Sequence, residues 1–116
     1  MRALARVRVD RAGAVPVAAV DGEIDASNVA EVGAELRAAV DNRASGLVVD
    51  LTPTSYLDSA GINLLFALGD EMRTRQQTLR LVVAPTSAIA RMLSITSLDR
   101  AHATYATVEE ALQAHF

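Results

Sequence analysis

The sequence contains no cysteine and no lysine, and these two absences exclude several kinds of functional site. A chain without cysteine forms no disulfide bond, holds no thiolate zinc site and has no cysteine nucleophile. Without lysine there is no P-loop lysine, and Gly61 stands outside any Gly-x-Gly-x-x-Gly loop, so nucleotide binding is left unsupported. The cationic residues are all arginines, scattered along a chain of net charge −3, which lacks the basic stripe that nucleic-acid binding requires.

Aromatic residues and long hydrophobic runs are also scarce. Aromatic residues make up 3% of the chain, and no window reaches the ~18 uninterrupted apolar residues of a membrane-spanning helix. The first four residues open no apolar stretch of signal-peptide length. We therefore expect a cytoplasmic protein with no direct membrane insertion. A chain of 116 residues suits a single domain, residues 1–116, that buries roughly 65% of the surface of the unfolded chain.

The hydrophobic residues, 51% of the chain, follow alternating strand-like and helix-like patterns. Apolar periodicity predicts strands at residues 5–10, 15–20, 46–50, 78–83 and 102–105. It predicts helices at residues 27–42, 60–75, 85–93 and from residue 107 onward. Turn-forming residues predict turns at residues 11–13, 21–25 and 52–55. The alternation predicts an α/β fold, with a single-layer mixed β-sheet of four to five strands and about four helices.

Two residues refine this outline. Pro16 cannot donate a hydrogen bond to a strand ladder, so it predicts a strand start or a strand at the sheet edge. Thr107 stands three residues before Glu110, which is the spacing of a capping box, and predicts the start of the last helix.

A serine stands where the third predicted strand hands over to the second predicted helix. Ser59 falls at or next to the N-cap of that helix, where unpaired N–H groups and the helix dipole favour a serine oxygen and a phosphate on it. An ordinary structural N-cap explains the same pattern and, taken alone, is the more frequent reason for a serine there. The apolar face of the helix is predicted to contain Ile62, Leu65, Phe66, Gly69 and Met72.

Several short blocks resemble one known family over nearly the whole chain. They are Gly22-Glu23-Ile24-Asp25, Asp50-Leu51, Asp58-Ser59-Ala60-Gly61-Ile62, Ser97-Leu98-Asp99 and Val108-Glu109-Glu110-Ala111-Leu112. In sequence and spacing these blocks look like the STAS domain, and specifically like the stand-alone bacterial anti-sigma factor antagonists. The block around Ser59 is the most specific of them, because it coincides with a strand-to-helix junction.

The resemblance implies a function controlled by phosphorylation. In that family the serine after the aspartate is phosphorylated by a partner, an anti-sigma factor with serine kinase activity, and the match carries this role to Ser59. Unphosphorylated protein would bind the anti-sigma factor and so release a sigma factor; a phosphatase would reverse the modification. The partner-binding residues implied are Asp25, Ser27, Asn28, Asp58, Ala60, Gly61 and Asn63. Asp25 and Asp58 have an equally good explanation as turn and cap residues. We expect a monomer or weak dimer.

The chain departs from the family pattern at two positions. Ala60 stands where the family often has serine or threonine, which leaves Ser59 as the only hydroxyl in its block. Ser97 stands where the family commonly has glycine, so the turn there is less relaxed if its φ is positive.

Catalysis is the least favoured function. A nucleophilic Ser59 lacks the Gly-x-Ser-x-Gly context, and the two histidines, His102 and His115, are expected at the surface, away from any catalytic role. We therefore expect a binding protein, without enzyme activity, cofactor or metal. Two other STAS roles remain open, a scaffold subunit of a stress-signalling assembly and an adaptor of a membrane transport complex.

Overall fold

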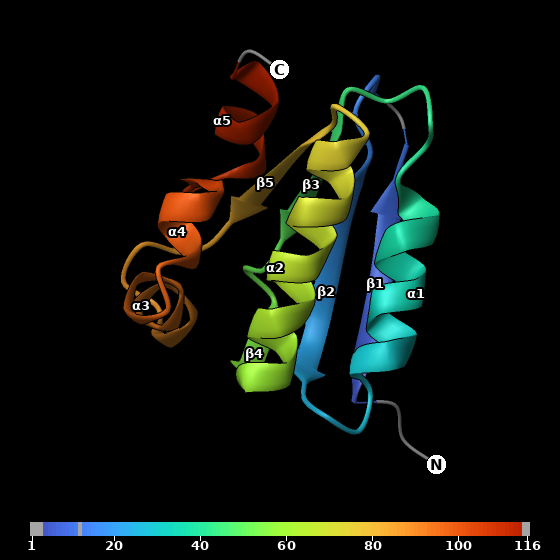
Figure 1. Ribbon diagram of the computed structural model, residues 1–116. Helices are drawn as coiled ribbons and strands as arrows, with labels where there is room; N and C mark the ends of the chain where they lie inside the picture. The colour runs from blue at the N-terminus through green and yellow to red at the C-terminus, as the bar shows by residue number, and fades with distance from the viewer. Residues whose placement is uncertain (1–3, 12, 115–116) are drawn as a thin grey trace.

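A single mixed β-sheet forms the centre of the computed structural model, which describes residues 4–11 and 13–114 (Figure 1). The strands are β1 (Ala5–Asp10), β2 (Val17–Ile24), β3 (Gly46–Asp50), β4 (Thr54–Leu57), β5 (Thr78–Val82) and β6 (Ala103–Tyr105). The helices are α1 (Val29–Ala39), α2 (Ser59–Thr74), α3 (Ala88–Ile95), α4 (Leu98–Ala101) and α5 (Val108–Gln113). The predicted α/β fold is confirmed, with one more strand and one more helix among the described residues than the sequence indicated.

The strand order is β1-β2-β3-β5-β6, and β4 pairs with β2 beyond the end of β3. Among the described strands, the β1–β2 pair alone is antiparallel; β2 pairs in parallel with β3 and β4, β5 with β3, and β6 with β5. Pro16 immediately precedes β2, which has neighbours on both sides, so its role as a strand start is confirmed and an edge position is excluded. The parallel arrangement brings the carboxyl ends of β2 to β6 to one edge of the sheet.

Helices α1 and α2 cover one face of the sheet (Figure 1). The side chains buried between the sheet and these helices include Ala18, Val20, Leu47, Val49, Leu81, Leu36, Leu65 and Leu68. The alternate residues of β3 and β5, Val48 and Val82, point to the other face and pack against Ala111 of α5. Each large apolar side chain buried in this way contributes about 1.5–3 kcal/mol, so the two-sided cover of β3 and β5 holds the centre of the sheet firmly.

Strand β2 runs past the end of β3, and this extension corrects two predicted turns. Residues 21–24 continue β2 instead of forming a turn, because β4 supplies them with a parallel partner. Thr54 and Ser55 accordingly belong to β4, and Thr54 Oγ1 donates to Val20 O at 2.7 Å. Gly22 permits the change of partner: its φ of +117° and its close approach to the backbone of Leu4 exclude a side chain.

The boundaries of the first and third helices also differ from the prediction. Helix α1 begins at Val29 and ends at Ala39, two residues later and three earlier than the pattern indicated. Helix α3 begins after Ser87, whose hydroxyl accepts the N–H of Ala90 at 3.1 Å, so the residues before it form a turn. Differences of two or three residues are usual for helix ends that are placed from sequence patterns.

The short helix α4 is absent from the sequence prediction. Ser97 has a φ of +64°, the left-handed conformation that glycine would adopt more readily, and it turns the chain sharply between α3 and α4. The buried side chain of Leu98 then fixes α4 against the core. Further along, Thr107 caps α5 as predicted, accepting the N–H of Glu110 at 3.1 Å.

His102 is buried, which corrects its expected position at the surface. Only 8% of the residue is exposed, and its imidazole lies directly over Gly69 of α2, where no side chain would fit. Burial lowers the pKa of His102, and the nearby positive charge of Arg73 lowers it further. The prediction for His115 lies outside the described residues. Within those residues, no helix is both long enough and apolar enough to cross a membrane.

Candidate functional site

Ser59 is the first residue of α2 and lies at the carboxyl edge of the sheet, just after β4. Its side chain is exposed, and its hydroxyl forms no hydrogen bond with any residue that the structure describes. The N-cap is Asp58, whose Oδ1 accepts the N–H of Gly61 at 3.1 Å. Ser59 is therefore next to the cap, and its hydroxyl is free to react because Asp58 does the capping.

Asp58 also connects two segments that are distant in sequence. Its Oδ2 accepts the N–H of Ala26 at 3.2 Å, and its own N–H donates to Ile24 O at 3.3 Å. Residues 25–28, which follow β2, are therefore held beside the start of α2. Ala26 could not be found from the sequence as a site residue, because it contributes only its backbone.

The turn at residues 25–28 is held by its own side chains. Asp25 Oδ1 accepts hydrogen bonds from Ser27 N at 2.8 Å and Ser27 Oγ at 2.5 Å. These bonds lower the pKa of Asp25, with the Ser27 hydroxyl as the largest cause. Asn28 accepts the N–H of Asp25 and donates from Nδ2 to Glu23 O at 2.8 Å, and only 8% of it is exposed. These hydrogen bonds fix the conformation of the turn in the absence of a partner.

Gly61 lets the start of α2 lie close to the strands. A Cβ on Gly61 would clash with Leu57 Cδ1 and would lie 3.2 Å from Ile24 Cγ2. Ala60, beside it, is half-buried, and Asn63, one turn further along α2, is exposed. Small residues around Ser59 leave its hydroxyl accessible to another protein surface.

The predicted site residues thus form one surface but have different parts in it. Ser27, Ser59 and Asn63 are exposed, whereas Asn28 and Gly61 are buried and shape the surface from beneath. The carboxylates of Asp25 and Asp58 are engaged within the turn and the cap, and neither has a hydrogen bond to Ser59. Groups of three or more residues suited to hold a metal ion do not occur in the described part of the chain.

Tyr56 is an exposed residue of this surface that the sequence analysis overlooked. It lies on β4, three residues before Ser59, and 48% of it is exposed. No strand-like alternation marks residues 54–57, which are buried, exposed, exposed and buried in turn, so the sequence contains no clear signal for Tyr56.

The chain is similar in sequence and in structure to known anti-sigma factor antagonists. The anti-sigma-F factor antagonist RsfB of Mycobacterium tuberculosis is 28% identical over 99 residues, which are 84% of this chain and 79% of that protein. A crystal structure of an anti-sigma factor antagonist from Mycobacterium paratuberculosis matches with a TM-score of 0.83 and 28% identity, covering 93% of this chain and 91% of that chain.

More distant relatives share the fold. The anti-sigma factor antagonist SpoIIAA in its unphosphorylated form matches with a TM-score of 0.74 and 19% identity, covering 92% of this chain and 93% of that one. The profile of the STAS domain family matches residues 6–111, which include every described strand from the second residue of β1 onward, the turn at residues 25–28 and the start of α2. The chain belongs to the STAS domain family.

Proposed function

We propose that this protein is an anti-sigma factor antagonist whose binding activity is controlled by phosphorylation of Ser59. In the unphosphorylated form it binds an anti-sigma factor with serine kinase activity and thereby releases a sigma factor. The kinase transfers phosphate to Ser59 and ends the interaction, and a phosphatase restores the binding form. The protein acts in the cytoplasm as one domain, residues 1–116, and is a substrate and a ligand without catalytic activity of its own.

The observation that carries this proposal is the free hydroxyl of Ser59 at an exposed helix start. A kinase needs an accessible hydroxyl that forms no hydrogen bond within the protein. Because Asp58 caps α2, the hydroxyl of Ser59 is not needed as the cap. The relatives of similar length at 28% identity are named as anti-sigma factor antagonists, which supports a protein-binding function for the same surface.

Phosphorylation would change the charge of this surface more than its shape. A phosphate adds about −1.5 to −2 charges and three acceptor oxygens. The N–H groups at the start of α2 favour negative charge, and the Ser59 side chain makes no hydrogen bond that the modification would break. The fold therefore changes little, while a partner that had packed against a small neutral side chain meets a bulky anion.

The direct experiment is a pull-down from the native cytoplasm with wild type, Ser59→Asp and Ser55→Asp. Ser55 is also exposed, lies on β4 close to the same surface and provides a matched control for the added charge. We expect an ATP-binding anti-sigma kinase to be retained by wild type and by Ser55→Asp and lost by Ser59→Asp. Retention by all three proteins would contradict the switch and favour a scaffold subunit or a transport adaptor.

A further inference from the structure

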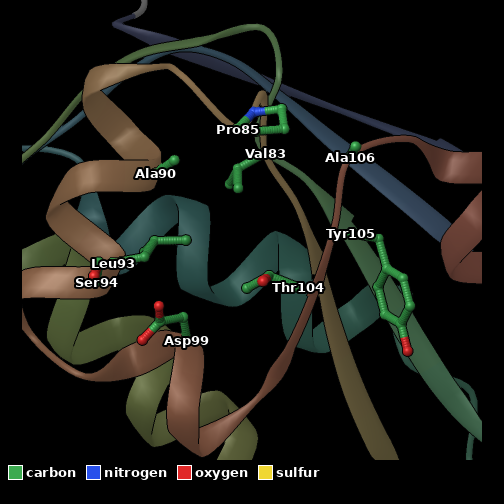
Figure 2. Close-up of a pocket in the computed structure, with 9 residues that line it drawn as sticks. All are labelled: Val83, Pro85, Ala90, Leu93, Ser94, Asp99, Thr104, Tyr105 and Ala106. Atoms are coloured by element: carbon green, nitrogen blue, oxygen red, sulfur yellow. The ribbon is translucent and has the colours of Figure 1, made fainter.

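A cavity of about 330 Å³ opens between α3, α4 and the end of β6, and Ser59 is not among the residues that line it (Figure 2). It lies beyond the carboxyl ends of β5 and β6, the edge at which open parallel sheets commonly bind ligands. Its volume is at the lower end of the roughly 300–1,000 Å³ typical of small-molecule sites. The residues that line it are Val83, Pro85, Ala90, Leu93, Ser94, Asp99, Thr104, Tyr105 and Ala106.

The inner wall of the cavity is apolar. Val83 and Leu93 are buried, and Figure 2 shows both side chains directed toward the cavity, with Ala90 beside them. The ring of Tyr105 turns away from the cavity and lies against Arg80, 5.6 Å from its guanidinium carbon. The aromatic ring therefore fills no part of the space, and a short aliphatic group would contact only small or branched apolar side chains.

Polar oxygen atoms surround this apolar wall on the open side. The carboxylate of Asp99 points into the cavity, and the hydroxyl of Thr104 faces it from β6 (Figure 2). Ser94 adds a second hydroxyl from α3. Across residues 4–11 and 13–114, the structure gives none of these three side chains a hydrogen bond or an ion pair. Asp99 is exposed to solvent, so its negative charge lies on the open side of the cavity without a partner among the described residues.

The position of Asp99 follows from the Ser97-Leu98-Asp99 block, which the proposed switch at Ser59 leaves unexplained. The left-handed conformation of Ser97 reverses the chain after α3, and the fully buried Leu98 fixes the start of α4. These two constraints place the next residue, Asp99, at the cavity. An acidic residue in the first turn of a helix is favoured by the helix dipole, but α4 has only four residues and its field is correspondingly weak.

We propose that this cavity binds a small aliphatic amine in its ammonium form. The ammonium group would donate hydrogen bonds to the Asp99 carboxylate and to the Thr104 and Ser94 hydroxyl oxygens, and the aliphatic part would cover Val83, Leu93 and Ala90. Charge-assisted hydrogen bonds of this kind are roughly twice as strong as neutral ones, so a cation is preferred over an alcohol of the same shape. The proposal does not depend on phosphorylation of Ser59.

The test is an amide NMR titration of the whole protein with isopentylamine at neutral pH, compared with isopentanol, which has the same shape without the charge. The amine should cause saturable shifts at Val83, Leu93 and Thr104. Binding of isopentanol to wild type, and of the amine to Asp99→Asn, should be at least about tenfold weaker. Glu109→Gln removes a carboxylate at the equivalent position of α5, outside the cavity, and should leave amine binding unchanged.

A second variant tests the location. Ala90→Leu adds a larger side chain within the cavity and should abolish the shifts from both probes, while the spectrum of the rest of the protein shows that the fold is kept. The proposal is overturned if isopentylamine causes no saturable shifts, if isopentanol binds as well as the amine, or if Glu109→Gln weakens amine binding as much as Asp99→Asn.

Discussion

The Asp58 carboxylate holds the N–H of Ala26, which lies 32 residues earlier in the chain, at 3.2 Å from Oδ2. Its other oxygen caps α2 at Gly61. One side chain therefore fixes both the turn at residues 25–28 and the helix start on which Ser59 stands. The exposed hydroxyl of Ser59, next to Asp58, forms no hydrogen bond that stabilises the fold. A reversible covalent switch requires such a hydroxyl.

This division of roles predicts different costs for two adjacent substitutions. Asp58→Ala removes the cap and the link to Ala26, and should lower the free energy of unfolding by about 1–2 kcal/mol. Ser59→Ala removes a hydroxyl that forms no hydrogen bond in the structure, and it should change the free energy of unfolding by less than about 0.5 kcal/mol. Denaturant titrations measure the free energy of unfolding of both variants. A larger loss of stability in Ser59→Ala than in Asp58→Ala would show that Ser59 is the cap instead.

Gly61→Ala should destabilise the protein although alanine favours helices. Helix propensity alone would add about 1 kcal/mol of stability. The new Cβ would clash with Leu57, and overpacking of this kind costs about 1–3 kcal/mol. We expect a net loss in thermal or denaturant unfolding. The control is Gly13→Ala, because a Cβ at Gly13 has no atom within 4 Å; a gain in stability from Gly61→Ala would show that α2 can move away from the strands.

The partner surface predicts a contrast between two exposed positions. Asn63→Arg places a bulky charge one turn from Ser59 and should weaken the complex with the anti-sigma factor by about 1 kcal/mol or more. Gln113→Arg, on α5 at the opposite end of the molecule in Figure 1, should leave affinity unchanged. The free energy of unfolding of both variants should lie within about 0.5 kcal/mol of that of wild type. Isothermal calorimetry that finds the loss in Gln113→Arg alone would move the interface to α5.

The buried His102 predicts a dependence of stability on pH. Burial lowers the pKa of His102 below its ordinary value of 6.5 in the folded protein, with a further contribution from Arg73 that Asp70 partly opposes. The unfolded chain therefore binds the proton first as pH falls through about 6.5, and stability decreases below that pH while remaining constant just above it.

The measurement is the free energy of unfolding between about pH 7.5 and about pH 5.5, in a His115→Gln background so that one histidine titrates. The loss of stability on acidification should be clear in this protein and much smaller in the His102→Gln, His115→Gln double variant. An equal slope in both proteins would assign the pH dependence to other groups.

The sequence patterns located most of the central elements because each carried its own local signal. The buried run of β3 and the capping residue Thr107 needed no knowledge of the tertiary structure. Strand β4 could not be predicted in this way. Its residues are typical of a turn, and they form a strand only because β2 extends beyond β3 and offers an unpaired edge.

In the candidate site, too, local sequence signals were found, whereas features that depend on distant contacts were missed. The sequence placed Ser59 within one residue of the helix cap, but it could not show that Asp58 also accepts the N–H of Ala26, 32 residues earlier. His102 was misplaced for a similar reason: its burial depends on Gly69 of α2, a neighbour that only the folded chain brings to it.

The role of Ser59 as the switch can be measured by incubating the protein with its anti-sigma kinase and ATP and mapping the phosphate by peptide mass spectrometry. We expect one phosphate, on Ser59, and no phosphate on Ser59→Ala, which keeps the fold and the Asp58 cap. A phosphate on Ser27, Thr52 or Ser55 in the wild-type protein, or undiminished phosphorylation of Ser59→Ala, would contradict it.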